Sequence, residues 1–145
     1  MTHHAPSGPC VVTVGQAILE RGKVNIENQV PKRIEVQVGQ ELHLHLQYRF
    51  EESSRDQEEF HIRLRSHIGD LRAPEADHHL RDHLWRSDAE WGFVRQAYPD
   101  LPVGTHELVV DMDARYGKQP WQGQGEETLD RAELAVSVPV VVSKS

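Results

Sequence analysis

Hydrophobic and polar residues alternate through the middle of the chain, from Glu41 to Arg65. The first run places alternate side chains on opposite faces of an extended strand: Leu42, Leu44, Leu46, Tyr48 and Phe50 against His43, His45, Gln47 and Arg49. After a polar break at residues 51–58 the pattern resumes, with Phe60, Ile62 and Leu64 against Glu59, His61, Arg63 and Arg65. Two such runs joined by a short polar link predict an antiparallel hairpin with one apolar face.

Further short runs of the same kind lie on both sides of this stretch. They cover residues 10–14, 34–38, 91–98, 105–116 and 132–142. Residues 15–33 are ambiguous, because 16–21 could form one helical turn and 23–27 could form a strand. Pro139 removes a backbone donor and therefore favours an edge position for the last strand. About seven or eight strands separated by turn signals predict an all-β, antiparallel, two-sheet sandwich.

One segment breaks the alternation and predicts a short helical insertion near residues 75–90. The apolar residues Ala76, Leu80, Leu84 and Trp91 recur at roughly helical spacing there. Pro74 suits the start of a helix, and the acidic residues Glu75 and Asp77 suit the positive end of its dipole.

Length and charge narrow the class of protein. A chain of 145 residues predicts a single domain at residues 10–145, preceded by a flexible arm at 1–9. A formal net charge of −7 argues against a nucleic-acid or anionic-membrane partner. The single cysteine, Cys10, excludes an internal disulfide. Neither a signal peptide nor a membrane-spanning run of apolar residues is seen, which predicts a cytoplasmic location.

The segment from Asp100 to Val110, with its Pro102-Val-Gly104 turn, resembles the last third of many immunoglobulin-like sandwiches. In those domains a Pro-x-Gly turn often precedes the penultimate strand, and a loop and a final alternating strand follow. The resemblance implies an immunoglobulin-like sandwich in general architecture. The cysteine pair of antibody domains is absent, and because such folds host binding modules, adhesion modules and enzyme appendages alike, it implies little about function.

The chain contains ten histidines, and one group of them lies on the predicted outer face of the hairpin. If the two strands pair, His61, Arg63 and Arg65 stand beside His43 and His45, forming a basic stripe on an acidic protein. The stripe is interpreted either as a solvated sheet face or as a face that recognises anions, since arginine offers a bidentate fork to carboxylate or phosphate. His43 and His45 could also bind a metal.

A second group, His79 and His83, would lie one turn apart on the predicted helix. That spacing allows two imidazoles to share a divalent metal, with a further ligand from His67, Asp82 or His106. The general base of a His-Glu-x-x-His motif is missing, and a solvated helix face explains the pair equally well.

The loop at residues 116–125 surrounds Trp121 with glycine, glutamine and proline. Trp121 either folds back onto the end of the sandwich or is exposed to a partner, with Tyr116 and Gln122 beside it. Exposed aromatic residues flanked by amides suit sugar rings and protein interfaces.

Sequence reasoning therefore favours a non-enzymatic binding module that holds a protein or carbohydrate partner through its end loops and the His/Arg face. No nucleophile or phosphate-loop motif is present, so no catalytic residue and no cofactor are assigned. One alternative is a metal-dependent protein, such as a hydrolase, that uses His79 and His83. Another is self-assembly into a homo-oligomer through exposed strand edges.

Overall fold

The computed structural model describes residues 8–51, 58–81, 91–118 and 128–144. Within these ranges the chain forms ten strands and no helix: β1 (Cys10–Glu20), β2 (Lys23–Asn28), β3 (Ile34–Gln37), β4 (Leu42–Phe50), β5 (Glu59–Ile68), β6 (Leu71–Arg72), β7 (Ala76–Arg81), β8 (Gly92–Tyr98), β9 (Gly104–Gly117) and β10 (Thr128–Ser143). The expectation of an all-β chain is confirmed, and no described helix is long and apolar enough to cross a membrane.

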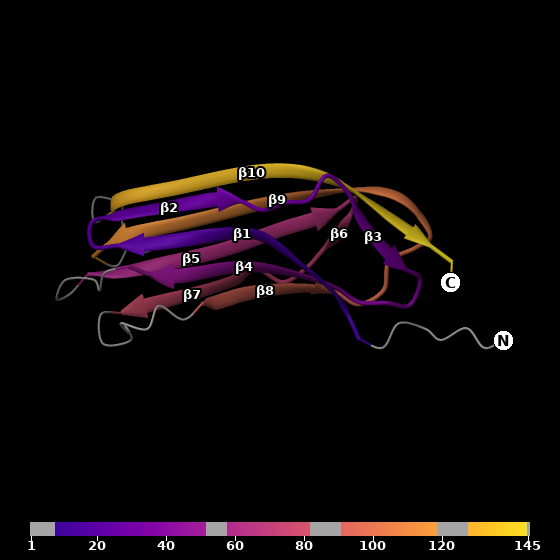
Figure 1. Ribbon diagram of the computed structural model, residues 1–145, viewed down its shortest axis with the longest axis horizontal. Coiled ribbons are helices and arrows are strands. Elements are labelled where there is room, and N and C mark those ends of the chain that lie inside the picture. Colours follow the sequence, from indigo (N-terminus) through magenta and orange to yellow (C-terminus); the bar gives the residue numbers. More distant parts are fainter. Residues whose placement is uncertain (1–7, 52–57, 82–90, 119–127, 145) are drawn as a thin grey trace.

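The strands form two sheets, which overlap in the view of Figure 1 and share one hydrophobic core. The first, which we call sheet A, has the order β2-β1-β4-β8. The second, sheet B, has the order β3-β10-β9-β5-β6, and β7 also pairs with β5. This arrangement is that of a β-sandwich, with one face of each sheet turned inward and the other outward.

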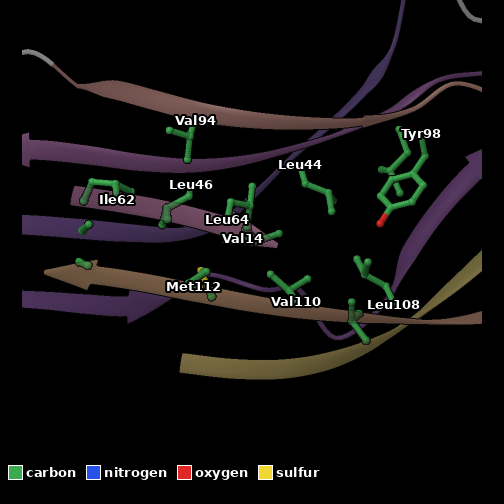
Figure 2. Close-up of a cluster of buried hydrophobic side chains, with 14 of the residues drawn as sticks. Val14, Leu44, Leu46, Ile62, Leu64, Val94, Tyr98, Leu108, Val110 and Met112 are labelled. Carbon is green, nitrogen blue, oxygen red and sulfur yellow. The ribbon is translucent and has the colours of Figure 1, made fainter. Parts of the chain in front are cut away.

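The core lies between the sheets and is made of the alternate residues that the sequence pattern identifies. Leu42, Leu44 and Leu46 of β4 are fully buried, as are Phe60, Ile62 and Leu64 of β5. Figure 2 shows side chains of both sheets meeting in this layer, with Leu44 and Leu46 on one side and Val110 and Met112 of β9 on the other. Burial of these apolar faces is the main force that holds the sheets together.

The predicted hairpin of residues 41–65 is wrong. β4 pairs with β1 and β8 in sheet A, whereas β5 pairs with β9, β6 and β7 in sheet B. Alternation shows that each strand has one buried face, but both sheets of a sandwich require that pattern. The polar link therefore joins strands of opposite sheets, not neighbours.

The sheets are also mixed and not purely antiparallel. β1 runs parallel to β4, and β3 runs parallel to β10. Parallel neighbours are not adjacent in the chain, so short-range patterns do not reveal them. Pro139 lies in an interior strand, but the β3 pairing begins only at Val140, so no β3 residue pairs with the proline.

The predicted helix near residues 75–90 is not seen. Residues Ala76–Arg81 form β7 instead, and residues 82–90 lie outside the described part of the chain. Ala76 and Leu80 fit a helical spacing, but both also fit the even positions of a strand. Leu80 is buried, and it pairs with Phe60 of β5 in the strand register. This pairing with the sheet favours a strand over a helix in this segment. Residues 16–21 likewise belong to strand β1 and its turn, while 23–27 form the expected strand.

Candidate binding surface

The split of β4 and β5 between two sheets separates the predicted His/Arg face. His43 and His45 lie on the outer face of sheet A, with their neighbours Leu42 and Leu44 turned inward. His61, Arg63 and Arg65 follow the same rule in β5 and lie on the outer face of sheet B. No single basic stripe exists, because the two groups are on opposite sides of the molecule.

On sheet B the basic residues are matched by acids. His61 is buried, and its Nε2 lies 3.1 Å from Oδ2 of Asp77 on β7. Arg63 and Arg65 both approach Oε1 of Glu75, at 3.7 and 3.5 Å. The outer face of sheet B therefore carries charges of both signs, with Arg63 and Arg65 next to Glu75.

The same alternation of charge continues across β9 and β10. The buried carboxylate of Asp113 accepts from Nε of Arg115 at 3.4 Å and from an Nη of Arg131 at 3.0 Å. Arg131 also pairs with Glu133. Of these pairs, Asp113–Arg131 joins β9 to β10, and cross-strand pairs of opposite charge stabilise a sheet, so this face has a structural explanation.

The outer face of sheet A differs, because it exposes aromatic rings beside basic side chains. We call the outward side chains of β4 and β8, together with the adjoining Trp91, the β4–β8 face: His43, His45, Gln47, Arg49, Trp91, Phe93, Arg95 and Ala97. Phe93 is 47% exposed and Trp91 is 39% exposed. Large exposed apolar side chains that lie close together are typical of interaction sites.

Each of these rings stacks on a side chain of β4. The imidazole of His45 and the ring of Phe93 are nearly parallel, with centroids 4.3 Å apart and an angle of 6° between their planes. The guanidinium carbon of Arg49 lies 4.7 Å from the centroid of the Trp91 ring, a cation–π contact. Because these contacts hold the rings in one orientation, little side-chain entropy remains to be lost when a partner binds.

The face is basic at its centre and acidic at its ends. Arg49 pairs with Glu51 at 2.6 Å, and Nε2 of His43 lies 3.8 Å from a carboxylate oxygen of Glu41. The pKa of His45 is held below its usual value, first by partial burial and then by the charges of His43 and Arg95. His45 is therefore harder to protonate than an ordinary imidazole.

Strand β8 is fixed from its inner side by a buried polar cluster. Ser66 of β5 donates its hydroxyl hydrogen to Oε1 of Gln96 at 2.5 Å and lies 2.7 Å from the hydroxyl of Tyr98, which can donate to it. Nε2 of Gln96 donates to the carbonyl of Pro74 at 2.8 Å. These bonds join the two sheets and turn Gln96 inward. Because successive side chains of a strand point to opposite faces, Arg95 points outward, and so does Phe93 two residues before it.

Sequence reasoning missed Trp91, Phe93 and Arg95 as site residues. One signal was available, because large side chains occur on both faces of the predicted strand at residues 91–98. Only one face of a strand needs apolar residues to pack against the core, so large side chains on the other face are exposed. Val94 and Tyr98 lie on the buried face of β8, so Phe93 lies on the exposed face.

The remaining predicted site residues lie elsewhere. Tyr116 is buried against Phe60 and donates its hydroxyl hydrogen to Glu58, so it lies in the core. His79 belongs to a strand, so its helical spacing to His83 is wrong. Trp121, Gln122 and His83 lie outside the described residues, and their roles stay predictions. Within the described ranges, no three His, Cys, Asp or Glu residues are placed to hold a metal.

The fold and this surface define a β-sandwich with an exposed aromatic and basic face. Comparison with protein-family models, with curated proteins and with solved structures finds no match to this chain.

Proposed function

We propose that this protein is a non-enzymatic binding module and that the β4–β8 face contacts its partner. The observation that carries this proposal is the pair of exposed rings, Trp91 and Phe93, each stacked on a basic side chain of β4. Aromatic residues and arginine are the residue types enriched among the side chains that dominate binding energy in interfaces.

The position of the two rings on the outer face of a sheet supports binding over catalysis. The outer face of a sheet offers a broad contact area, whereas enzyme sites are concave and exclude water. The immunoglobulin-like architecture expected from the sequence is compatible with this role, since such sandwiches often serve as binding modules. The loop that contains Trp121 and Gln122 is a second proposed contact, and Trp121→Ala is expected to weaken binding without changing the melting temperature.

The test uses two ligand collections, a random peptide library displayed on phage and an array of immobilised glycans. Each ligand that the wild-type protein selects is measured again with the double variant Trp91→Ala/Phe93→Ala. We expect its affinity to fall by about tenfold or more, because the two anchoring rings are lost.

The matched control is Leu129→Ala, which removes a 60% exposed apolar side chain from sheet B. The control should leave affinity unchanged, and both variants should unfold cooperatively on heating, as a folded domain does. Ligands that bind the double variant and the wild type equally well would place the site elsewhere. Failure to select any ligand from either collection would contradict the proposal.

A further inference from the structure

The centre of the β4–β8 face contains basic residues and no carboxylate, on a chain whose formal net charge is −7. Its outward residues include Arg49, Arg95, His43 and His45. The nearest acids, Glu41 and Glu51, stand at the two ends and are engaged by His43 and Arg49. This distribution contrasts with sheet B, where acids accompany the four arginines of the face whose ion pairs are described: Arg63, Arg65, Arg115 and Arg131. The centre of the β4–β8 face is thus locally positive through Arg95, and it complements a negative ligand.

Arg95 is the cation best placed to bind such a ligand. Its side chain is exposed, and it forms no ion pair among the described residues. The register places Arg95 directly opposite His45, and Phe93 precedes it by two residues on the same face of β8. An exposed guanidinium, an imidazole and a phenyl ring therefore meet within one small area. A carboxylate fits the guanidinium fork, and an apolar side chain fits the ring.

We propose that the β4–β8 face binds an acidic peptide segment, holding a carboxylate between Arg95 and His45 and an apolar side chain against Phe93, and that binding strengthens as the pH falls because His45 takes up a proton. This inference rests on the proposed function, to which it adds the class of partner and its regulation.

The pH dependence follows from the groups that face His45. His43 lies beside it on β4, Arg95 opposite it on β8, and uncharged Thr13 next to it on β1. In the free protein, partial burial and the two basic neighbours lower the pKa of His45. A bound carboxylate would offset that repulsion and favour the imidazolium, so the pKa rises in the complex. Binding is then coupled to proton uptake, and affinity increases on acidification.

A peptide fits these observations better than a long polyanion. Nucleic acids and acidic polysaccharides carry charge over distances that extend past the small positive area, and the rest of this acidic chain would repel them. The two rings each have one face occupied by His45 or Arg49, which leaves less open ring surface for stacking on a sugar. A peptide segment with one or two carboxylates beside apolar side chains contacts only the small positive area and avoids repulsion by the rest of the chain.

The test starts from peptides selected at about pH 6, where a proton on His45 would matter. Among peptides that require Trp91 and Phe93, we expect enrichment in Asp and Glu beside large apolar residues. The tightest peptide is then synthesised with its acids and with the matching amides. The acidic form should bind several-fold more tightly at about pH 5.5 than at about pH 8, and the amide form should show no such change.

Two variants separate the contributions. Arg95→Gln should weaken the acidic peptide by about tenfold at both pH values, as expected for a lost ion pair. His45→Gln should retain the affinity seen at high pH and lose the increase at low pH. His67→Gln, on the outer face of sheet B, is the matched control and should keep that increase.

The outcomes distinguish this inference from the proposed function. Ligands that need Trp91 and Phe93 but are indifferent to Arg95→Gln and His45→Gln, or that are uncharged peptides or glycans, would overturn the acidic-peptide assignment and leave a binding module. A pH dependence that persists in His45→Gln would overturn the regulatory part. The absence of any ligand that depends on the two rings would contradict both proposals.

Discussion

The imidazole of His45 lies flat against the ring of Phe93, with 4.3 Å between their centroids. The two residues are diagonal neighbours on adjacent strands, since His45 is opposite Arg95 and Phe93 is opposite Gln47. Such diagonal pairs are within reach of aromatic side chains and stabilise a sheet. The contact covers part of the imidazole, and partial burial is the first cause of the lowered pKa of His45. The packing of the face therefore affects the charge of this histidine.

The first prediction concerns the pKa of His45. Because burial and the neighbours His43 and Arg95 lower this pKa, the imidazole should titrate below the usual value of about 6.5. Phe93→Ala removes one covering ring and should raise the pKa toward that value, while Leu129→Ala should not change it. NMR titration of the imidazole carbon-bound protons measures all three. An unchanged pKa in Phe93→Ala would show that the ring does not shield the imidazole.

The lowered pKa also fixes how stability depends on pH. Well above about pH 6.5 the imidazole is predominantly neutral in the unfolded chain, and with its lowered pKa also in the folded chain, so it adds little pH dependence there. As the pH falls below that value, the unfolded chain binds a proton that the folded chain does not, and the free energy of unfolding decreases. Urea unfolding at about pH 7.5 and about pH 5.5 should therefore show a larger loss on acidification for the wild type than for His45→Gln.

The buried polar cluster gives the second prediction. Ser66→Ala removes the donor to Gln96 and the partner of Tyr98, leaving polar atoms unsatisfied in the core. The free energy of unfolding should fall by about 1–3 kcal/mol. Ser137→Ala is the control, since Ser137 is exposed on β10 and its loss should change stability by less than about 0.5 kcal/mol. Equal melting temperatures for the two variants would show that the cluster does not hold the sheets together.

The faces of the strands were predictable from the sequence, whereas the pairing of the strands was not. Leu108, Val110 and Met112 are buried as expected, and so are Val138 and Val140. Alternation depends only on which face of a strand meets the core, and that information is local. The partner of each strand depends on contacts between distant segments, such as the parallel pairing of β1 with β4.

The candidate site shows the same limit. His43 and His45 were predicted to lie on an outer face, and they do. Their expected neighbours, His61 and Arg63, proved to be on the other sheet, and the true neighbours Phe93 and Arg95 come from a strand about fifty residues away in sequence. Whether a basic residue is available to a ligand also depends on its acidic partners, and these too come from other strands, as Glu75 does for Arg63.

The third prediction tests the charged network of sheet B. Asp113 is buried and accepts from Arg115 and Arg131, so Asp113→Ala leaves two guanidinium groups without this acceptor. We expect a loss of about 1–3 kcal/mol in the free energy of unfolding. Asp111→Ala is the control, because Asp111 is an exposed carboxylate two residues away on the same face of β9. If both variants unfold at the same urea concentration, the network does not contribute to stability.

The fourth prediction concerns a close contact between the sheets, at Gly15 of β1 and Met112 of β9. A Cβ built on Gly15 would lie 2.4 Å from the sulfur of Met112, with the Leu46 side chain at 3.2 Å and the Glu27 carbonyl at 3.3 Å. Gly15→Ala therefore forces the Met112 side chain to move within a packed core, at an expected cost of about 1–3 kcal/mol. Shortening the opposing side chain should remove that conflict, so the cost of Gly15→Ala should be much smaller when it is made together with Met112→Ala. Urea unfolding of the four proteins gives the coupling energy between the two positions. A coupling energy near zero would mean that the contacts with Leu46 and the Glu27 carbonyl, and not the contact with Met112, set the cost of Gly15→Ala.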